Sequence, residues 1–302
     1  MGRTALTIGN FDGVHLGHAA LVEAARRAAG AGGRTIVLTF DPPPVLVLQP
    51  EAAPRRLMVP TRRVAALQAL GVDEVIVQAI DRDWLMQGPE DFLHESVEPL
   101  GPDVVVEGAD FRFGLGRTGD IEALTAFGRT RGFHVEVVSD VSAKLTDASS
   151  VIVRSSVIRA LLERGRVADA AAMLGRPWCL EGQVVPGDAR GRVIGCPTAN
   201  LDHGDLILPA DGVYAGMATC PDGTYPAAVS VGTKPTFEGT PRVAEVHLIG
   251  WDGPVGVYGW SLEVHLTRWI RDQARFDSVQ ALKDRIAGDI EEVLRGGATP
   301  AR

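Results

Sequence analysis

From Met1 to about Gly132, short β-type runs alternate with helical patterns, and few folds accommodate such a chain. Parallel strands need crossover connections, which helices usually supply, so the alternation predicts a parallel sheet in a doubly wound α/β, Rossmann-like domain. Strands are predicted at residues 5–9, 35–40, 73–79, 104–107 and 134–138, and helices at 17–29, 61–70, 89–97 and 121–131. The proline cluster at residues 42–44 predicts a loop.

The second part of the chain has a different pattern. A helical stretch at residues 155–174 ends at a Gly-Arg-Pro sequence, so we expect one domain at residues 1–176 and another at 177–302. Glycine-rich turns then separate closely spaced β-type runs, without helices, which predicts a small antiparallel β-barrel with strands at 183–185, 212–219, 227–231, 244–249 and 261–266. A helix packed on the barrel is predicted at residues 278–294 from apolar residues at helical spacing, namely Val279, Leu282, Ile286, Ile290 and Leu294.

Composition narrows the functional classes. The chain has 302 residues, of which 45% are hydrophobic and 23% charged, which excludes a disordered, collagen-like or coiled-coil protein. The formal net charge of −8 argues against nucleic acid or an anionic membrane as a partner. Three cysteines make no disulfide framework, and neither a secretory leader pattern nor an apolar run of membrane-spanning length is present, so we expect a cytoplasmic protein.

The segment from Gly9 to His18 lies where the first predicted strand turns into the first helix. Backbone N–H groups and the positive end of the helix dipole meet at such a junction, which predicts an anion site. His15 and His18 share one face of the helix start, although they could merely cap it. The histidines are candidate catalytic residues, and the candidate nucleotide-binding residues are Gly9, Asn10, Phe11 and Gly13.

A second glycine-rich segment spans residues 187–201. Its backbone N–H groups could wrap phosphates, and the candidate nucleotide-binding residues are Gly187, Arg190, Gly191 and Arg192. Thr198 and Asn200 are two residues apart, a spacing that can place two oxygen ligands on one side of an extended strand toward Mg²⁺. A solvated hairpin would give a similar pattern.

These segments, with several others in matching order, resemble the motifs of the bacterial bifunctional riboflavin kinase/FMN adenylyltransferase family. The first segment looks like the His-x-Gly-His signature of nucleotidyltransferases, and the second is similar to the riboflavin kinase signature. The resemblance covers nearly the whole chain, and the further matching blocks are residues 104–120, 155–159, 209–216, 231–237 and 244–248.

The resemblance implies two reactions: riboflavin and ATP give FMN and ADP in the barrel, and FMN and ATP give FAD and pyrophosphate in the α/β domain. It assigns His15 and His18 to the nucleotide phosphates, with Asn10 and Asp110 positioning the nucleotide or the flavin. Asp110 could instead form an Asx-type turn. A further phosphate clamp is implied at Ser155, Ser156 and Arg159, although a hydroxyl pair at a helix start could equally be an N-cap.

In the barrel, the resemblance implies that Glu245 is the general base that accepts the proton of the ribityl 5′-hydroxyl. An ordinary surface glutamate on a strand is the alternative. His247 is expected to be structural, and Arg271 to contact the flavin. The implied cofactor is Mg²⁺ with ATP as co-substrate, the partners are small-molecule flavins and ATP, and the expected state is a monomer or a transient oligomer.

Three positions depart from the family pattern. Pro43 stands where the family commonly has histidine, Arg154 where it has serine, and Val157 where it has a polar residue. These departures leave open a paralogue with kinase activity but a weak or altered adenylyltransferase. A flavin-binding regulator without turnover is a second alternative, and the presence of Glu245 and both histidines argues against it.

Overall fold

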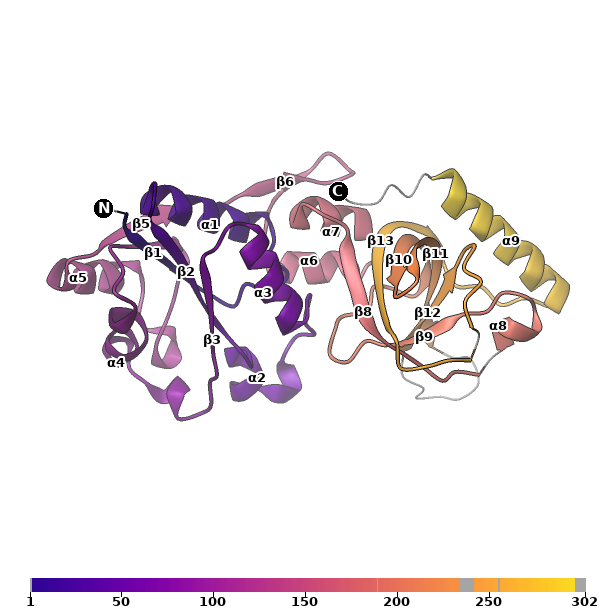
Figure 1. Ribbon diagram of the computed structural model, residues 1–302, viewed down its shortest axis with the longest axis horizontal. Helices are drawn as coiled ribbons and strands as arrows, with labels where there is room; N and C mark the ends of the chain where they lie inside the picture. Colours follow the sequence, from indigo (N-terminus) through magenta and orange to yellow (C-terminus); the bar gives the residue numbers. More distant parts are fainter. Residues whose placement is uncertain (1, 189, 234–241, 255, 297–302) are drawn as a thin grey trace. The chain divides into compact units, whose positions relative to one another are not determined.

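The computed structural model describes residues 2–188, 190–233, 242–254 and 256–296. Its contacts divide the chain into an N-terminal unit, residues 1–143 with 152–154, and a C-terminal unit, residues 144–151 with 155–302. Figure 1 shows an open sheet in the first unit and a barrel in the second. The contacts thus place residues 155–176 with the barrel. The sequence-based division after residue 176 remains a proposal about where the two functions separate.

The N-terminal unit contains a five-stranded parallel sheet, as predicted. Its strand order is β3-β2-β1-β4-β5, in which the central β1 pairs with β2 on one side and with β4 on the other. Ala5, Leu6 and Val105 are fully buried, as expected for strands covered on both faces. The strands are β1 (Thr4–Ile8), β2 (Arg34–Phe40), β3 (Glu74–Gln78), β4 (Val104–Gly108) and β5 (His134–Val138).

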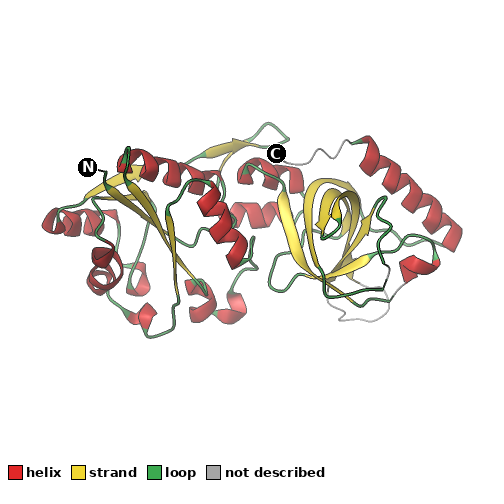
Figure 2. Ribbon diagram, in the orientation of Figure 1, coloured by secondary structure: helices red, strands yellow, loops and turns green. Residues whose placement is uncertain are grey.

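Helices pack on both faces of this sheet, which makes it doubly wound (Figure 2). On one face, α1 (Leu16–Ala29) and α3 (Pro60–Ala69) bury Val22 and Leu67 against β2. On the other face, α4 (Pro89–Phe92), the π-helix η3 (Leu93–Val97) and α5 (Ile121–Arg131) form a larger cluster with Leu6 and Ile36. Short 3₁₀ turns lie at η1 (Pro50–Ala52), η2 (Trp84–Met86), η4 (Glu98–Leu100) and η5 (Leu115–Arg117).

Several local expectations were wrong. The expected loop after β2 contains a short helix, α2 (Pro44–Leu48), because proline is well tolerated in a helix's first turn. The single helix predicted at 155–174 is two helices, α6 (Ser155–Leu162) and α7 (Val167–Leu174), separated by a turn in which Gly165 has a φ of 71°. A small two-stranded sheet, β6 (Ser142–Lys144) with β7 (Ser150–Ile152), was not predicted.

The C-terminal unit contains a closed antiparallel barrel, which confirms the second fold prediction. Alternate side chains fill its interior: Val264, Leu266 and Val246 are fully buried. Around the barrel the strands are β10 (Gly212–Cys220), β11 (Gly223–Thr233), β12 (Arg242–Leu248), β9 (Ala199–Asp202), β8 (Trp178–Val185) and β13 (Ser261–Arg271). Strand β9 was not among the predicted strands, and the barrel region also holds one short helix, α8 (Arg190–Val193).

The predicted C-terminal helix is α9 (Val279–Arg295), and the Ser278 hydroxyl caps it by accepting a hydrogen bond from the Ala281 amide. The predicted apolar stripe is only partly correct. Val279 and Leu294 at its two ends are exposed, whereas Val293 is buried against the barrel.

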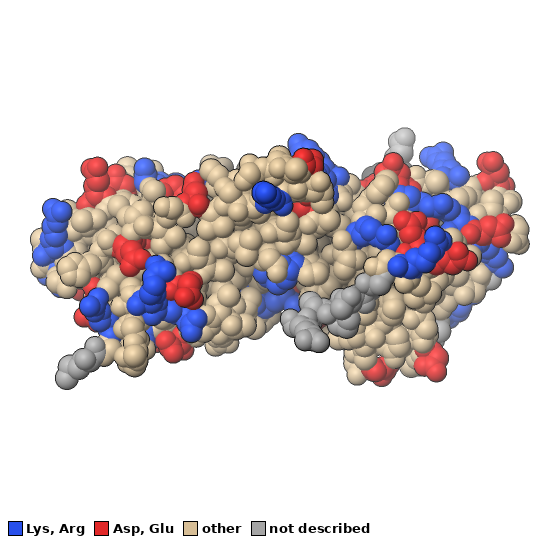
Figure 3. All heavy atoms as spheres, turned by 90° about the horizontal axis from the view of Figure 1, so that it is seen from above, with Lys and Arg blue, Asp and Glu red and all other residues tan. Residues whose placement is uncertain are grey.

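Charged side chains of both signs are mixed on the surface. On the face seen in Figure 3, the described Lys and Arg side chains are interspersed with Asp and Glu, and neither sign forms a broad patch there. Within the described part of the chain, no helix has both the length and the apolar character needed to cross a membrane.

Candidate functional sites

The β1–α1 junction in the N-terminal unit has an unusual backbone. Phe11, Gly13 and Val14 all have positive φ values, of 49°, 85° and 40°, which non-glycine residues rarely adopt. The side chains of Phe11 and Val14 are 1% and 4% exposed and pack in the core between β2, α1 and α3, and this anchors the strained loop. The Phe11 side chain is therefore committed to the core, and its backbone is the part that a ligand could meet.

The two histidines cap α1 reciprocally. The Nδ1 atom of His15 accepts from the His18 amide and the Nδ1 atom of His18 accepts from the His15 amide, both at 3.3 Å. Their rings stack with centroids 3.6 Å apart. An imidazole whose Nδ1 accepts carries its proton on Nε2 when neutral. The histidines thus cap the helix, which was the alternative to phosphate binding, and the same bonds leave each neutral ring with an Nε2–H donor.

Arg63 on α3 supports the same edge of the sheet, a role that was not predicted. Its Nη1 donates to the Asn10 carbonyl and its Nη2 to the Phe40 carbonyl, each at 3.0 Å, although the residue is only 3% exposed. The Thr39 hydroxyl also donates to the Asn10 carbonyl, at 3.2 Å. Burial lowers the pKa of Arg63, partly offset by Asp41 and Asp12. Arg63 therefore joins the carboxyl ends of β1 and β2.

Asp110, just beyond β4, forms an ion pair with Arg154. Arg154 also donates to Asp140, at 3.2 Å, and these two carboxylates raise its pKa, with Asp110 contributing most. A backbone bond from the Phe111 amide to the Gly108 carbonyl closes the turn at Asp110, rather than the Asp110 side chain. Arg154, which departs from the family pattern, thus forms the ion pair with Asp110, one of the predicted nucleotide-binding residues.

The third predicted block lies in the C-terminal unit. Ser155, Ser156 and Arg159 occupy the first turns of α6, whose Ile158 is fully buried. Ser155 and Arg159 are half-buried and Ser156 is exposed.

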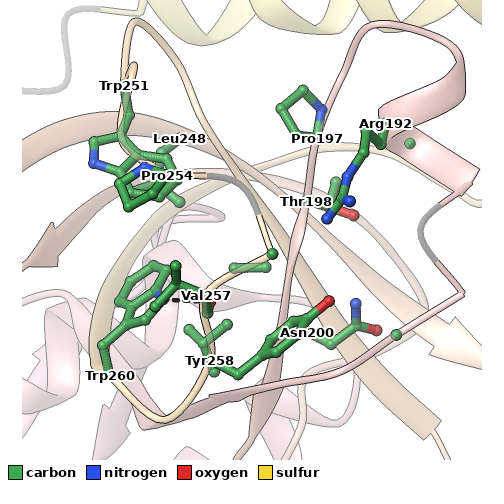
Figure 4. A pocket seen from close by; sticks show the side chains of 15 residues that line it. Arg192, Pro197, Thr198, Asn200, Leu248, Trp251, Pro254, Val257, Tyr258 and Trp260 are labelled. Carbon is green, nitrogen blue, oxygen red and sulfur yellow. Dashed lines mark hydrogen bonds between the residues drawn. The ribbon is translucent and has the colours of Figure 1, made fainter.

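The barrel carries an open cavity (Figure 4). Five residues expected at the phosphate and metal positions line it: Gly187, Gly191, Arg192, Thr198 and Asn200. The side chain of Arg190 and residues 234–237 of the matching block at 231–237 lie outside the described part of the structure. A Cβ atom at Gly191 would lie 2.4 Å from the Cys196 carbonyl oxygen, so this tight turn requires glycine.

An apolar and aromatic wall faces these polar residues across the cavity. Figure 4 shows Trp251, Trp260 and Pro254 on the side opposite Arg192 and Thr198. The Trp251 and Trp260 rings lie 5.5 Å apart, and their indole N–H groups donate to the Asp222 carboxylate and the Val257 carbonyl. No role was predicted for these tryptophans, although the occurrence of two tryptophans within ten residues could have indicated an aromatic binding surface.

Glu245 lies beside the cavity on β12. It is directly paired with Asn200 on β9 and with Ser230 on β11, and its neighbours Ala244 and Val246 point into the barrel. Paired residues of adjacent antiparallel strands have Cβ atoms about 5 Å apart, so the predicted base and one predicted metal ligand are neighbours. His247 bonds the Pro197 carbonyl at 2.8 Å, which agrees with the structural role expected for it.

Arg271, expected to contact flavin, is held by the C-terminal helix. Its Nε lies 3.0 Å from both carboxylate oxygens of Asp289, and its Nη2 donates to one of them at 2.7 Å. Its Nη1 donates to the Asp272 carbonyl, and the guanidinium lies over the Phe276 ring. Most donors of Arg271 are therefore used within the protein.

Comparison with known proteins agrees with this two-part arrangement. The family model described as FAD synthetase matches residues 1–152, and the model described as riboflavin kinase matches residues 174–295. The bifunctional riboflavin kinase/FMN adenylyltransferase of Escherichia coli is 35% identical over 94% of this chain and 90% of its own length. The Bacillus subtilis protein of the same name is 30% identical, over 97% and 92%.

The chain belongs to the bifunctional riboflavin kinase/FMN adenylyltransferase family. Among solved structures, one described as a macrolide-efflux protein from Streptococcus pneumoniae has a TM-score of 0.85 and 31% identity, covering 97% of this chain and 94% of its own. Both halves of the family's architecture are present, because the FAD synthetase match contains the parallel sheet and the riboflavin kinase match contains the barrel. The two-activity family is thus favoured over a paralogue with one activity and over a regulator without turnover.

Proposed function

We propose that the two reactions of the family are carried by separate residue sets, with the functional division after residue 176. The barrel would phosphorylate riboflavin, and the parallel-sheet domain would adenylylate the resulting FMN. The observation that supports this proposal is the cross-strand pair of Glu245 and Asn200, the latter lining the barrel cavity, because phosphoryl transfer needs a base close to the metal ligands.

In the barrel, the ATP phosphates bind along the segment from Gly187 to Arg192, and the aromatic wall of Trp251 and Trp260 accommodates the adenine ring. Thr198 and Asn200 offer the neutral oxygen atoms that Mg²⁺ accepts, so the residues present fit this ion. When bound there, Mg²⁺ neutralises charge on the transferred phosphoryl group.

Glu245 accepts the proton of the ribityl 5′-hydroxyl as that oxygen bonds to the γ-phosphorus. The bond from the γ-phosphorus to the β,γ-bridging oxygen breaks, so ADP leaves and FMN forms. The backbone N–H groups of the glycine-rich segment and Arg192 hold the phosphates in place during this displacement.

In the parallel-sheet domain, an oxygen of the FMN phosphate attacks the α-phosphorus of the second ATP, and pyrophosphate leaves. The Nε2–H groups of His15 and His18 donate to phosphate oxygens as charge develops on them. Backbone groups of Gly9, Asn10, Phe11 and Gly13 approach the nucleotide, and Asp110 positions the nucleotide or the flavin. The phosphate-binding roles of Ser155, Ser156 and Arg159 rest on their likeness to the family's third motif.

Product analysis by chromatography tests this division. With riboflavin, ATP and Mg²⁺, the full chain should form FMN and then FAD. Glu245→Gln should abolish FMN formation but leave FAD formation from supplied FMN, and His15→Ala with His18→Ala should do the reverse. Loss of both activities in either folded variant would contradict the separation of the two residue sets.

A cytoplasmic location and a monomeric or transiently oligomeric state are also part of the proposal. No disulfide joins Cys179, Cys196 or Cys220, all three of which lie in the described part of the chain, and this fits a reducing compartment.

A further inference from the structure

Three side chains capable of binding a metal meet outside the sites described above. Cys179 on β8 and Glu263 and His265 on β13 bring a sulfur, a carboxylate oxygen and an imidazole nitrogen within 4.8 Å of one another. None of the three lines the cavity, and neither proposed reaction uses them.

The strand register explains why they meet. His265 pairs directly with Cys179 across the β8–β13 ladder, and Glu263 pairs with Glu181. Leu262, Val264 and Leu266 alternate with Glu263 and His265 and are fully buried in the barrel interior. Since successive side chains of a strand point to opposite faces, Glu263 and His265 lie on the outer face of the barrel, beside Cys179.

We propose that Cys179, Glu263 and His265 form a Zn²⁺ site on the outer face of the barrel. Zn²⁺ takes sulfur, nitrogen and oxygen ligands at about 2.0–2.3 Å, so neighbouring ligand atoms in a tetrahedral site are about 3.5 Å apart. Donor atoms that already lie within 4.8 Å of one another need only small side-chain rotations to reach that spacing.

The ligand chemistry selects the metal. A thiolate with an imidazole favours Zn²⁺ over Mg²⁺ and Ca²⁺, which prefer sets made of oxygen atoms alone. Binding converts the Cys179 thiol to a thiolate and releases one proton, so the affinity rises with pH. Three protein ligands leave a fourth position for water. Because the ligands lie on the first and last strands of the barrel, the ion ties together segments that are far apart in the sequence.

Cobalt substitution tests the site in the full chain, after treatment with a chelator and dialysis. Co²⁺ bound to a thiolate gives an intense near-ultraviolet absorption band, which Zn²⁺ removes by displacing it. The chain has only three cysteines, so a variant with Cys196→Ser and Cys220→Ser isolates Cys179. We expect this variant to keep the band and to saturate at one Co²⁺ per chain.

The matched variant Cys179→Ser, with the other two cysteines intact, should lose the band. His265→Ala should weaken Zn²⁺ binding, measured by calorimetry, by about 100-fold or more. Circular dichroism verifies that each variant is folded, and Glu263→Gln provides a milder change if His265→Ala does not fold. A wild-type protein without the band, or a band that survives Cys179→Ser, would overturn the proposal.

Discussion

Replacing Asp289 with alanine tests whether Arg271 serves mainly to hold the C-terminal helix. The Asp289 side chain is 4% exposed and that of Arg271 is 17% exposed, and Arg285 lies 3.1 Å from the same carboxylate. Removing one partner of a buried ion pair typically costs about 3–5 kcal/mol, because the other charge stays buried without its partner. Arg271 keeps its bond to the Asp272 carbonyl and some solvent, so we expect about 3 kcal/mol.

For a unit of about 150 residues, this loss corresponds to a fall in Tm of about 6–12 °C, measured by calorimetry on the full chain. The matched control is Glu291→Ala on the same helix, since its pair with Arg295 is exposed on both sides and contributes little. FMN formation at varied riboflavin concentration is measured on both variants. If Asp289→Ala unfolds within about 1 °C of the control while the KM for riboflavin rises, the pair is not structural and Arg271 acts on the flavin.

Three further outcomes follow from the geometry. Burial raises the pKa of the Glu107 carboxyl well above its ordinary 4.5, and this effect outweighs the opposite effect of the hydrogen bond from the Ile8 amide. The stability that Glu107 contributes in its neutral form is therefore complete below about pH 4.5 and is lost as the pH rises. Glu107→Gln should therefore exceed the wild type in urea stability at about pH 8, and this advantage should shrink toward about pH 4; an equal difference at both pH values contradicts the assignment. Arg63→Met should lower kcat for FAD formation by about tenfold or more with riboflavin kinase activity unchanged, and Arg63→Lys should restore part of it; an equal loss in both reactions would indicate a general folding defect. Trp251→Ala should raise the KM for ATP by about tenfold in FMN formation only, and an unchanged KM would remove the tryptophan from the adenine site.

The sheet and the barrel could be predicted because their strands carry strong local patterns. Strands β1, β2 and β4 are rich in apolar and β-branched residues, and the glycine-rich turns mark most barrel strands. Strand β9 escaped prediction because its four residues follow directly on a glycine-rich loop and carry too little periodicity. For α9, spacing alone indicated a buried stripe, but at the C-terminal end Val293 faces the barrel and Leu294 does not, and Val279 at the other end is exposed.

The predicted sites depended on motifs, and what was missed depended on contacts between distant segments. Nothing near Arg63 in the sequence indicates that its guanidinium reaches the carbonyls of Asn10 and Phe40. Arg154 was noticed only as a departure from the family pattern, and its pairing with Asp110 emerges only when β4 and residues 152–154 fold together. Such contacts are set by tertiary packing, which local propensity does not encode.

A chain with a net charge of −8 must attract polyphosphates through local features of its binding sites. Arg56, Arg154 and Arg271 each pair with a carboxylate, so these cations add little net positive field around them. At the β1–α1 junction, oriented dipoles add to the charge of Arg63 in attracting phosphate: they are the amides of the helix start and the Nε2–H groups of two capping histidines. Fixed dipoles act only at short range and in one direction. They recognise a phosphate by its position and not by its overall charge, which suits a site that must bring two phosphorylated substrates into line.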